Sequence, residues 1–281
     1  MRVLVLGADG MLGHRLVRTL FGRHDVCATT RAAGPPPFAG LDARDASALE
    51  RVFDAARPAT VVNAIGLVKQ RPETADTVAA IEVNALLPHR LAALCRERAV
   101  RLVHVSTDCV FSGRRGGYRE EDEPDPVDTY GRTKLIGEVT DAPAVTLRTS
   151  LVGLERRGAR GLVEWFLSRT GEVHVYTRAR FSGLTTAEAA RVVARILETG
   201  SPASGLWHVA SAPITKAELL SGLLGRLART DVRLVEDDSV VIDRTLDGSR
   251  FAAETGYKAP HWPEMLDELA EAIRERQEWN G

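Results

Sequence analysis

The chain alternates short apolar runs with helical patterns from its first residues to Ser150. The runs "RVLVLG", "HDVCATT", "ATVVNAIG", "VRLVHVST" and "AVTLRTS" have the length and continuous apolar character of buried parallel strands. Helical patterns separate them, at 11–21, 46–58, 77–99 (with Pro88 inside) and 128–140. Repeated β-α-β units with short connections predict an α/β fold, a doubly wound parallel sheet with helices on both faces.

A glycine-rich turn joins the first expected strand to the first expected helix. "LGADGMLG" carries Gly7, Gly10 and Gly13 in a G-x-x-G-x-x-G spacing, with Met11 and Leu12 between the last two. In this context the glycines permit a tight turn, close approach to a pyrophosphate and close helix packing, and the helix N-terminus offers free N–H groups. We therefore predict that these five residues bind a dinucleotide cofactor. A plain glycine turn is the alternative.

The end of the second expected strand indicates which dinucleotide is bound. An acidic residue there would hold a ribose 2′-hydroxyl, but "ATTRAAG" places Thr30 and Arg31 at this point. A guanidinium and hydroxyl groups suit a 2′-phosphate, so NADPH is the predicted cofactor and NADH the alternative. Asp42 follows a short extended segment, where it either accepts from an adenine amino group or caps the next turn.

The ends of two later strands carry small and polar residues. Asn63, Ala64 and Gly66 follow the apolar part of "VVNAIG", and Thr107 and Asp108 end "HVSTD". The carboxyl ends of parallel strands meet at one sheet edge, where ligands bind. We expect the first three to border the nicotinamide ribose, and Thr107 and Asp108 to contact a substrate carbonyl.

Tyr130 and Lys134 lie one helical turn apart in "TYGRTKLIGE", in a chain with only four tyrosines and four lysines. Side chains at i and i+4 share a helix face. A buried ammonium beside a phenol is expected to lower the phenol pKa from about 10 toward the working range, and Lys134 can also donate to the cofactor ribose. With Thr107 polarising the carbonyl oxygen and Tyr130 protonating it, this predicts reduction of a ketone by hydride transfer. A surface tyrosine beside a snorkelling lysine is the alternative.

The charge balance, the cysteines and the N-terminal apolar run indicate which classes of partner this chain is expected to lack. The 37 basic and 38 acidic residues give a net charge of -1, which argues against a general nucleic-acid surface. The three cysteines Cys27, Cys95 and Cys109 have no metal-binding spacing, so reduced thiols, a cytoplasmic location and no metal are expected. The N-terminal apolar run is too short for a signal-peptide core or a membrane span, so no membrane partner is expected.

The motifs together resemble the extended short-chain dehydrogenase/reductases, and within them the dTDP-4-dehydrorhamnose reductase-like group. The resemblance covers nearly the whole chain and is most specific in "VSTDCVFSG", "TYGRTKLIGE" and "VTLRTSLVG". It implies a Rossmann-type sheet with Thr107, Tyr130 and Lys134 as catalytic residues, and Asn63 and Ala64 as cofactor contacts.

After Ser150 the alternating pattern loosens into helical segments at 162–169, 185–200, 216–229 and 262–279 and one strand at 205–211. We predict a dinucleotide-binding domain made of 1–150 and 185–210. A smaller, partly interleaved substrate domain is predicted from 151–184 and 211–281.

The resemblance implies an NAD(P)H-dependent oxidoreductase that reduces the 4-keto group of a nucleotide-linked 6-deoxy sugar, with dTDP-4-dehydrorhamnose as the lead candidate. One alternative is another nucleotide-sugar reductase, or an epimerase/reductase, for polysaccharide or glycosylated-metabolite biosynthesis. A second alternative is a non-catalytic NADP-binding regulatory subunit. A homodimer is compatible with the resemblance, although Arg15 stands where some members place a metal-binding glutamate, which speaks against a metal-linked dimer.

Two arginine-containing segments are candidates for the substrate diphosphate. "DRTLDGSRF" resembles the family's Arg-rich substrate segment and makes Arg250 a candidate. Arg178 and Arg180 in "YTRARFSGLTT" either meet the same diphosphate or are ordinary surface charges.

The histidines His104, His174 and His208 lie in apolar strands. Lone strand histidines are more often hydrogen-bonded structural groups than ligands, so we interpret all three as structural.

Overall fold

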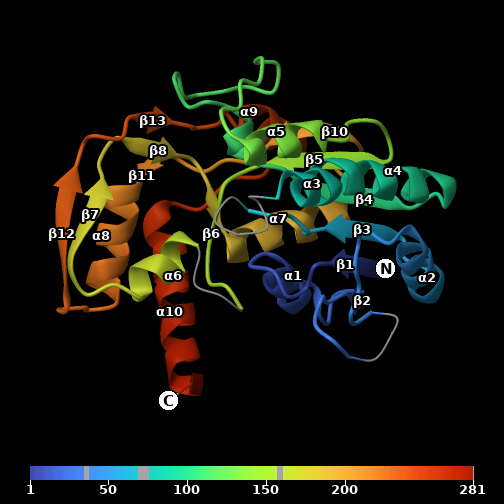
Figure 1. Ribbon diagram of the computed structural model, residues 1–281, viewed down its shortest axis with the longest axis horizontal. Helices are drawn as coiled ribbons and strands as arrows, with labels where there is room; N and C mark the ends of the chain where they lie inside the picture. The colour runs from blue at the N-terminus through green and yellow to red at the C-terminus, as the bar shows by residue number, and fades with distance from the viewer. Residues whose placement is uncertain (35–37, 69–75, 157–160, 281) are drawn as a thin grey trace.

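A six-stranded parallel sheet forms the centre of the molecule (Figure 1). The computed structural model describes residues 1–34, 38–68, 76–156 and 161–280. The strand order is β10-β5-β4-β3-β1-β2. The bounds are β1 Arg2–Leu6, β2 Asp25–Ala28, β3 Thr60–Asn63, β4 Arg101–Val105, β5 Ala144–Arg148 and β10 Gly205–His208.

Alternate residues of these strands enter two separate apolar layers, because successive side chains of a strand point to opposite faces. Val3 and Val5 of β1 pack with α1 (Gly13–Leu20) and α7 (Thr186–Thr199), whereas Leu4 and Leu6 pack with α2 (Ala46–Ala56) and α4 (Leu87–Glu97). Helices therefore cover both faces, and the predicted doubly wound α/β fold is confirmed.

The helical stretch expected at 77–99 is built from three parts. α3 (Thr77–Ala80) continues into a π-helical segment, Ile81–Leu86, and then into α4, whose first turn holds Pro88. Pro88 has no N–H to donate and stands directly after the π-helical segment, where the regular i to i−4 hydrogen-bond pattern is already interrupted. Among the described residues this stretch, Thr77–Glu97, is long and apolar enough to cross a membrane by length and composition alone. Here it lies against β4 and against α5 (Thr129–Ile136), with Leu91 and Cys95 in the core.

The later part of the chain contains short strands that periodicity did not predict. β7 (Gly171–Tyr176) pairs with β12 (Val232–Asp237), β8 (Ala179–Phe181) lies between β11 (Ile214–Thr215) and β13 (Ile242–Asp243), and β6 (Leu151–Val152) pairs with β9 (Leu184–Thr185). Most have only two or three residues, too few to establish an alternating pattern. The helices of this part are α6 (Leu162–Leu167), α8 (Lys216–Arg226), α9 (Ser249–Thr255) and α10 (Trp262–Asn280).

The chain returns to the central sheet after α7, because β10 pairs with β5. One continuous apolar core runs from Val3 in β1 to Val173 in β7 and Ile273 in α10. The division of the chain at 150, 184 and 210 therefore stays a prediction. The short extended segment expected before Asp42 is not a strand in the structure.

Candidate active site

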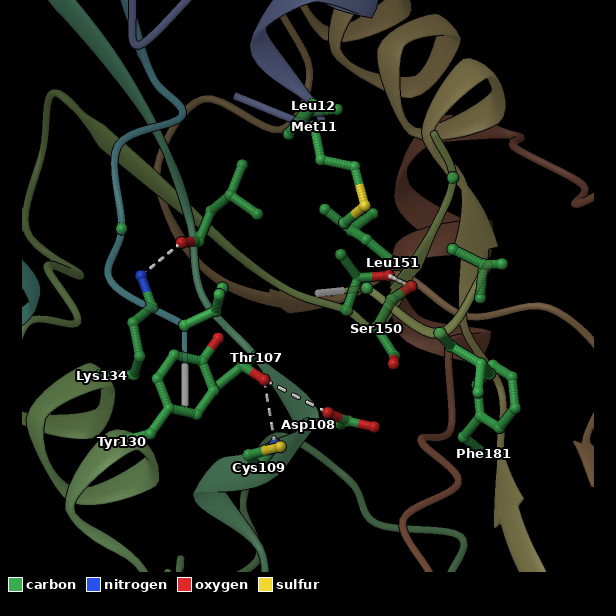
Figure 2. A pocket seen from close by; sticks show the side chains of 18 of the residues that line it. Met11, Leu12, Thr107, Asp108, Cys109, Tyr130, Lys134, Ser150, Leu151 and Phe181 are labelled. Carbon is green, nitrogen blue, oxygen red and sulfur yellow. Dashed lines mark hydrogen bonds between the residues drawn. The ribbon is translucent and has the colours of Figure 1, made fainter. Parts of the chain in front are cut away.

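A cavity of about 400 Å³ lies at the carboxyl edge of the central sheet (Figure 2). Its walls come from the glycine loop, the ends of β3, β4 and β5, α5, and the β8 and β13 region. Lining residues that the sequence singled out are Gly10, Met11, Leu12, Ala64, Gly66, Thr107, Asp108, Tyr130, Lys134 and Arg180. The glycine loop and the Tyr-x-x-x-Lys helix therefore line the same cavity, although more than a hundred residues separate them in the sequence.

The glycine loop is shaped by backbone contacts that exclude side chains. Gly7 has φ +87°, a left-handed conformation in which a Cβ is strained. A Cβ at Gly13 would overlap the carbonyl oxygen of Gly7, and one at Gly10 would come within 3.2 Å of the same oxygen. The loop therefore presents bare backbone at the N-terminus of α1, an arrangement that fits the pyrophosphate of a dinucleotide.

Tyr130 and Thr107 meet at the cavity wall (Figure 2). The Thr107 hydroxyl accepts a hydrogen bond from the Cys109 N–H at 3.1 Å and donates to Oδ1 of Asp108 at 3.2 Å. Burial is the largest influence on the phenol and raises its pKa, the charge of Cys109 adds to the rise, and the Thr107 hydrogen bond partly offsets it. The expectation that the pKa of Tyr130 lies below its usual value is wrong, because desolvation outweighs the other influences on the phenol. The raised pKa keeps the proton on Tyr130, as a proton donor requires.

Lys134 is almost completely buried beside Tyr130, with an exposure of 3%. Its Nζ donates to the carbonyl oxygen of Val105 at 2.7 Å and lies 3.4 Å from Nε2 of His104. Burial lowers the pKa of Lys134 to about 8, and the carboxylate of Glu138 acts in the opposite direction. This amine is therefore close to a change of protonation state in the neutral range.

Close backbone packing places α5 at the cavity. The Asp128 carboxylate accepts from the Gly131 N–H at 2.7 Å and caps the helix N-terminus. A Cβ at Gly131 would overlap the carbonyl oxygen of Cys109, and a Cβ at Gly137 would overlap that of Asn84. Two glycines in "YGRTKLIGE" thus allow α5 to approach both the short η3 helix (Asp108–Val110) and the π-helical segment.

Residues 1–275 match the model of the family described as RmlD substrate binding domain. This chain belongs to that family. It is an extended short-chain dehydrogenase/reductase of the dTDP-4-dehydrorhamnose reductase-like group, as its motifs predicted.

Three similar proteins illustrate the family. A dTDP-4-keto-6-deoxy-D-glucose reductase of Streptomyces niveus is 42% identical over 139 residues, which cover 49% of this chain and 46% of that protein. A dTDP-4-dehydrorhamnose reductase of Burkholderia thailandensis is 31% identical over 75% of this chain and 73% of its own. The solved structure of a hypothetical dTDP-4-dehydrorhamnose reductase from Sulfolobus tokodaii is 26% identical, with a TM-score of 0.79 over 93% of this chain and 98% of that one.

Thr30, Arg31 and Asp42, which were predicted to contact the adenosine part of the cofactor, are not among the lining residues of the cavity. The segment of Thr30 and Arg31 is tied to the glycine loop by the Ala32 N–H, which donates to Oδ2 of Asp9 at 3.4 Å. The Thr30 hydroxyl donates to the carbonyl oxygen of Ala32 at 3.3 Å, and Arg31 is exposed. The Asp42 carboxylate accepts from the Arg44 N–H at 3.0 Å and from its guanidinium at 2.6 Å, which lowers the Asp42 pKa to about 2. Of the two roles considered for Asp42, the structure shows the turn cap.

Of the three candidate arginines on the substrate side, only Arg180 lines the cavity, and Arg244, which was not a candidate, lines it as well. Arg180 on β8 and Arg244 after β13 line the cavity, whereas Arg178 and Arg250 are not among its lining residues. Arg250 lies on α9 with its guanidinium 4.4 Å from the centre of the Trp207 ring. The expected position of Arg250 at the substrate site is therefore not seen in the structure, where Arg244 of the same "DRTLDGSRF" segment lines the cavity instead.

Asn63 and Asn84 are buried and fully engaged with neighbouring groups. The Asn63 side chain contacts His104 and the Ile65 N–H, behind the cavity wall. Asn84 accepts from the Leu67 N–H at 2.8 Å and donates to the Leu67 carbonyl oxygen at 3.0 Å. Both asparagines hold the segment after β3, which carries Ala64 and Gly66 into the cavity.

Sequence reasoning missed several lining residues because no local motif marks them. They are Ser150, Phe181, Lys216, Val240, Ile242 and Arg244. Only Arg244 could have been found from the sequence, since it lies in the same "DRTLDGSRF" segment as Arg250.

Proposed function

We propose that this chain reduces the 4-keto group of a nucleotide-linked 6-deoxy sugar with NADPH as the preferred cofactor. dTDP-4-dehydrorhamnose is the lead substrate. The observation that carries the proposal is that Thr107, Tyr130 and Lys134 share one cavity with the glycine loop. The names of the similar reductases support the same substrate class.

Residues of the chain that would hold the dinucleotide are Gly7, Gly10, Met11, Leu12 and Gly13 at the pyrophosphate, Thr30 and Arg31 at the 2′-phosphate, and Ala64, Gly66 and Lys134 at the nicotinamide ribose. Asn63, which the sequence also placed at the ribose, is buried behind the cavity wall and supports the segment that carries Ala64 and Gly66. When bound, the cofactor supplies the hydride that reduces the carbonyl carbon. A guanidinium at position 31 supports a preference for the 2′-phosphate, with NADH as the weaker cofactor.

Tyr130 is the proton donor of this mechanism. Its phenol keeps its proton because burial raises its pKa, and it gives that proton to the carbonyl oxygen as charge develops there. The Thr107 hydroxyl lines the same cavity and would donate to the same oxygen in place of Oδ1 of Asp108, to which it donates at 3.2 Å in the structure. A charged Lys134 amine on the same helix face stabilises the phenolate that remains.

Three cations from the later part of the chain make the cavity suited to a nucleoside diphosphate. Arg180 and Arg244 project from the β8 and β13 region, and Lys216 begins α8 nearby with its ammonium 5.8 Å from the centre of the Tyr176 ring. These three cations line the same cavity as Tyr130 and would hold the diphosphate of a sugar nucleotide whose keto group meets the phenol.

The test is loss of NADPH absorbance with purified protein and dTDP-4-keto-L-rhamnose generated in situ. Turnover that depends on Tyr130 would support the proposal. Binding of NADPH without turnover would direct the search to UDP- and GDP-linked keto sugars, and absence of turnover with all of these would favour the regulatory-subunit alternative. A cytoplasmic location and a homodimer stay predictions.

A further inference from the structure

A buried row of polar groups runs behind the cavity from Lys134 through His104 to Asn63. Nζ of Lys134 lies 3.4 Å from Nε2 of His104, and Nδ1 of His104 lies 3.1 Å from Nδ2 of Asn63. His104 and Asn63 have no exposed surface, and Lys134 has 3%. Polar groups this far from solvent satisfy one another's hydrogen bonds.

The backbone determines how protons are arranged along this row. The Ile65 N–H donates to Oδ1 of Asn63 at 3.1 Å, so the amide NH2 of Asn63 faces the imidazole. Nδ1 of His104 must then accept, which leaves the single proton of a neutral ring on Nε2. Burial keeps the ring neutral, because it lowers the pKa of His104 well below its usual range. The ring therefore presents an N–H to Lys134.

The Lys134 amine meets this N–H on one side and a carbonyl on another. It already donates to the Val105 carbonyl oxygen at 2.7 Å. A neutral amine can pair with both neighbours, since it donates to Val105 and accepts from His104 with its lone pair. An ammonium has three donors and no acceptor, so it would set one N–H against another.

We propose that His104, oriented by Asn63, is a positioning residue that weakens the proton affinity of the Lys134 amine. Desolvation of the amine acts in the same direction, because burial lowers the Lys134 pKa to about 8. Burial disfavours the charged amine whatever its neighbours are, whereas the N–H of His104 opposes a proton on the side of the amine that it faces.

Other titratable groups around the amine act on it less directly. The Glu138 carboxylate raises the proton affinity of Lys134. It is, however, occupied by the Arg148 guanidinium at 2.7 and 2.8 Å and by the Ser106 hydroxyl at 2.7 Å. Tyr130 on the same helix is protonated, since its own pKa is raised.

Three further titratable groups act on the neighbours of the Lys134 amine. Asp108 and Cys109 of the η3 helix act on the Tyr130 phenol, and His89 of α4 acts on His104. The hydrogen-bond contacts of the Lys134 amine itself are with the Val105 carbonyl oxygen and the His104 ring.

The consequence of this inference for the rate of reduction rests on the function proposed above. A charged Lys134 amine stabilises the phenolate left on Tyr130, and a neutral one does not. The rate of reduction should therefore fall as pH rises through the midpoint of Lys134, near 8. A variant that restores the proton affinity of the amine should extend activity to higher pH.

The primary test is a titration of Lys134 that does not depend on catalysis. The chain has four lysines, so protein labelled with 13C-lysine gives few Cε signals, and that of Lys134 is identified by its absence in Lys134→Met. His104→Gln and His104→Asn both remove the imidazole N–H that faces the Lys134 amine. In His104→Gln the amide oxygen can also accept from the ammonium. Both variants should raise the Lys134 midpoint by about one pH unit.

Matched controls separate this effect from general perturbation. His174→Gln changes a strand histidine on β7, away from Lys134, and should leave the midpoint unchanged. Thermal melting establishes that each variant is folded, and His104→Asn serves if His104→Gln is not. An unchanged or lowered Lys134 midpoint in a folded His104 variant would overturn the proposal.

The pH dependence of kcat then distinguishes this inference from the proposed function. A shift of both the Lys134 titration and the alkaline limb of kcat supports both. A shifted titration with an unshifted limb supports the role of His104 and contradicts the role assigned to Lys134 in turnover.

Discussion

Arg244 and Arg250 come from one short segment, yet Arg244 lines the cavity and Arg250 packs its guanidinium 4.4 Å from the centre of the Trp207 ring. Arg244 also donates to the carbonyl oxygen of Phe111 at 2.9 Å, which orients the side chain with 9% exposure. The segment thus contributes one arginine to the candidate substrate site and one to packing.

Replacement of Arg244 should weaken substrate binding. Hydrogen bonds to charged groups contribute about 1.5–3 kcal/mol, so Arg244→Ala should raise KM roughly tenfold to a hundredfold with a smaller effect on kcat. Arg250→Ala is the matched control from the same segment and should leave KM near that of the wild type. Steady-state kinetics check both, and the reverse pattern would return the diphosphate contact to Arg250.

Removal of the Tyr130 hydroxyl should abolish proton transfer while leaving the cavity intact. Tyr130→Phe keeps the ring on α5, so NADPH affinity measured by fluorescence titration should change little. The turnover number should fall about 10²- to 10⁴-fold, the usual contribution of general acid catalysis. Wild-type turnover in this variant would remove Tyr130 from the mechanism.

Arg31 should discriminate between the two nicotinamide cofactors. It is exposed at the end of β2, where a guanidinium can meet a 2′-phosphate but gains nothing from a 2′-hydroxyl. Arg31→Ala should weaken NADPH about tenfold, equivalent to about 1.4 kcal/mol, and NADH much less. Arg51→Ala on exposed α2 is the control, and equal weakening of both cofactors by Arg31→Ala would contradict the 2′-phosphate argument.

The buried pair of Glu138 and Arg148 should be important for stability. Their side chains are 6% and 3% exposed, and removal of one partner leaves an uncompensated buried charge. Glu138→Ala should lower the free energy of unfolding by about 3–5 kcal/mol, measured by urea denaturation. The exposed pair Arg233–Glu172 is the comparison, where Glu172→Ala should cost no more than about 1 kcal/mol. Similar losses in the two variants would refute this ranking.

His208 should make the protein sensitive to mild acid. Burial, and then the charge of Arg148, lower its pKa from 6.5 to about 4. Below pH 6.5 the unfolded chain takes up a proton that the folded chain resists, so stability should decline as pH falls from 6.5 to 4. The full loss is about 3 kcal/mol, from about 1.4 kcal/mol per pKa unit. The pH dependence of unfolding in this window should flatten in His208→Gln, and an unaltered slope would assign it to other groups.

The fold could be predicted because its signals are local. "RVLVLG" is apolar on both faces and "LGADGMLG" carries its glycines at the strand–helix junction, so neither depends on distant residues. The short strands β6, β8, β11 and β13 escaped prediction, since two or three residues acquire extended structure only from the partner that pairs with them.

Some features of the candidate site could likewise be predicted from the sequence, and others depend on contacts between distant residues. The i, i+4 spacing of Tyr130 and Lys134 places both on one helix face in any α-helix, and the structure directs that face to the cavity. The direction of the Tyr130 pKa was mispredicted, because it depends on how much water the surrounding elements exclude. His104 was interpreted as structural from its strand alone, whereas its significance comes from Asn63 on β3 and Lys134 on α5.

The sequence by itself determined the α/β architecture, the bare-backbone glycine loop and the pairing of a phenol with an amine, because each follows from periodicity or spacing within a single element. Tertiary structure decided which arginine reaches the cavity, which protonation states are favoured and which buried histidine touches the lysine. These depend on contacts between residues tens to hundreds of positions apart, and on the desolvation that such contacts produce.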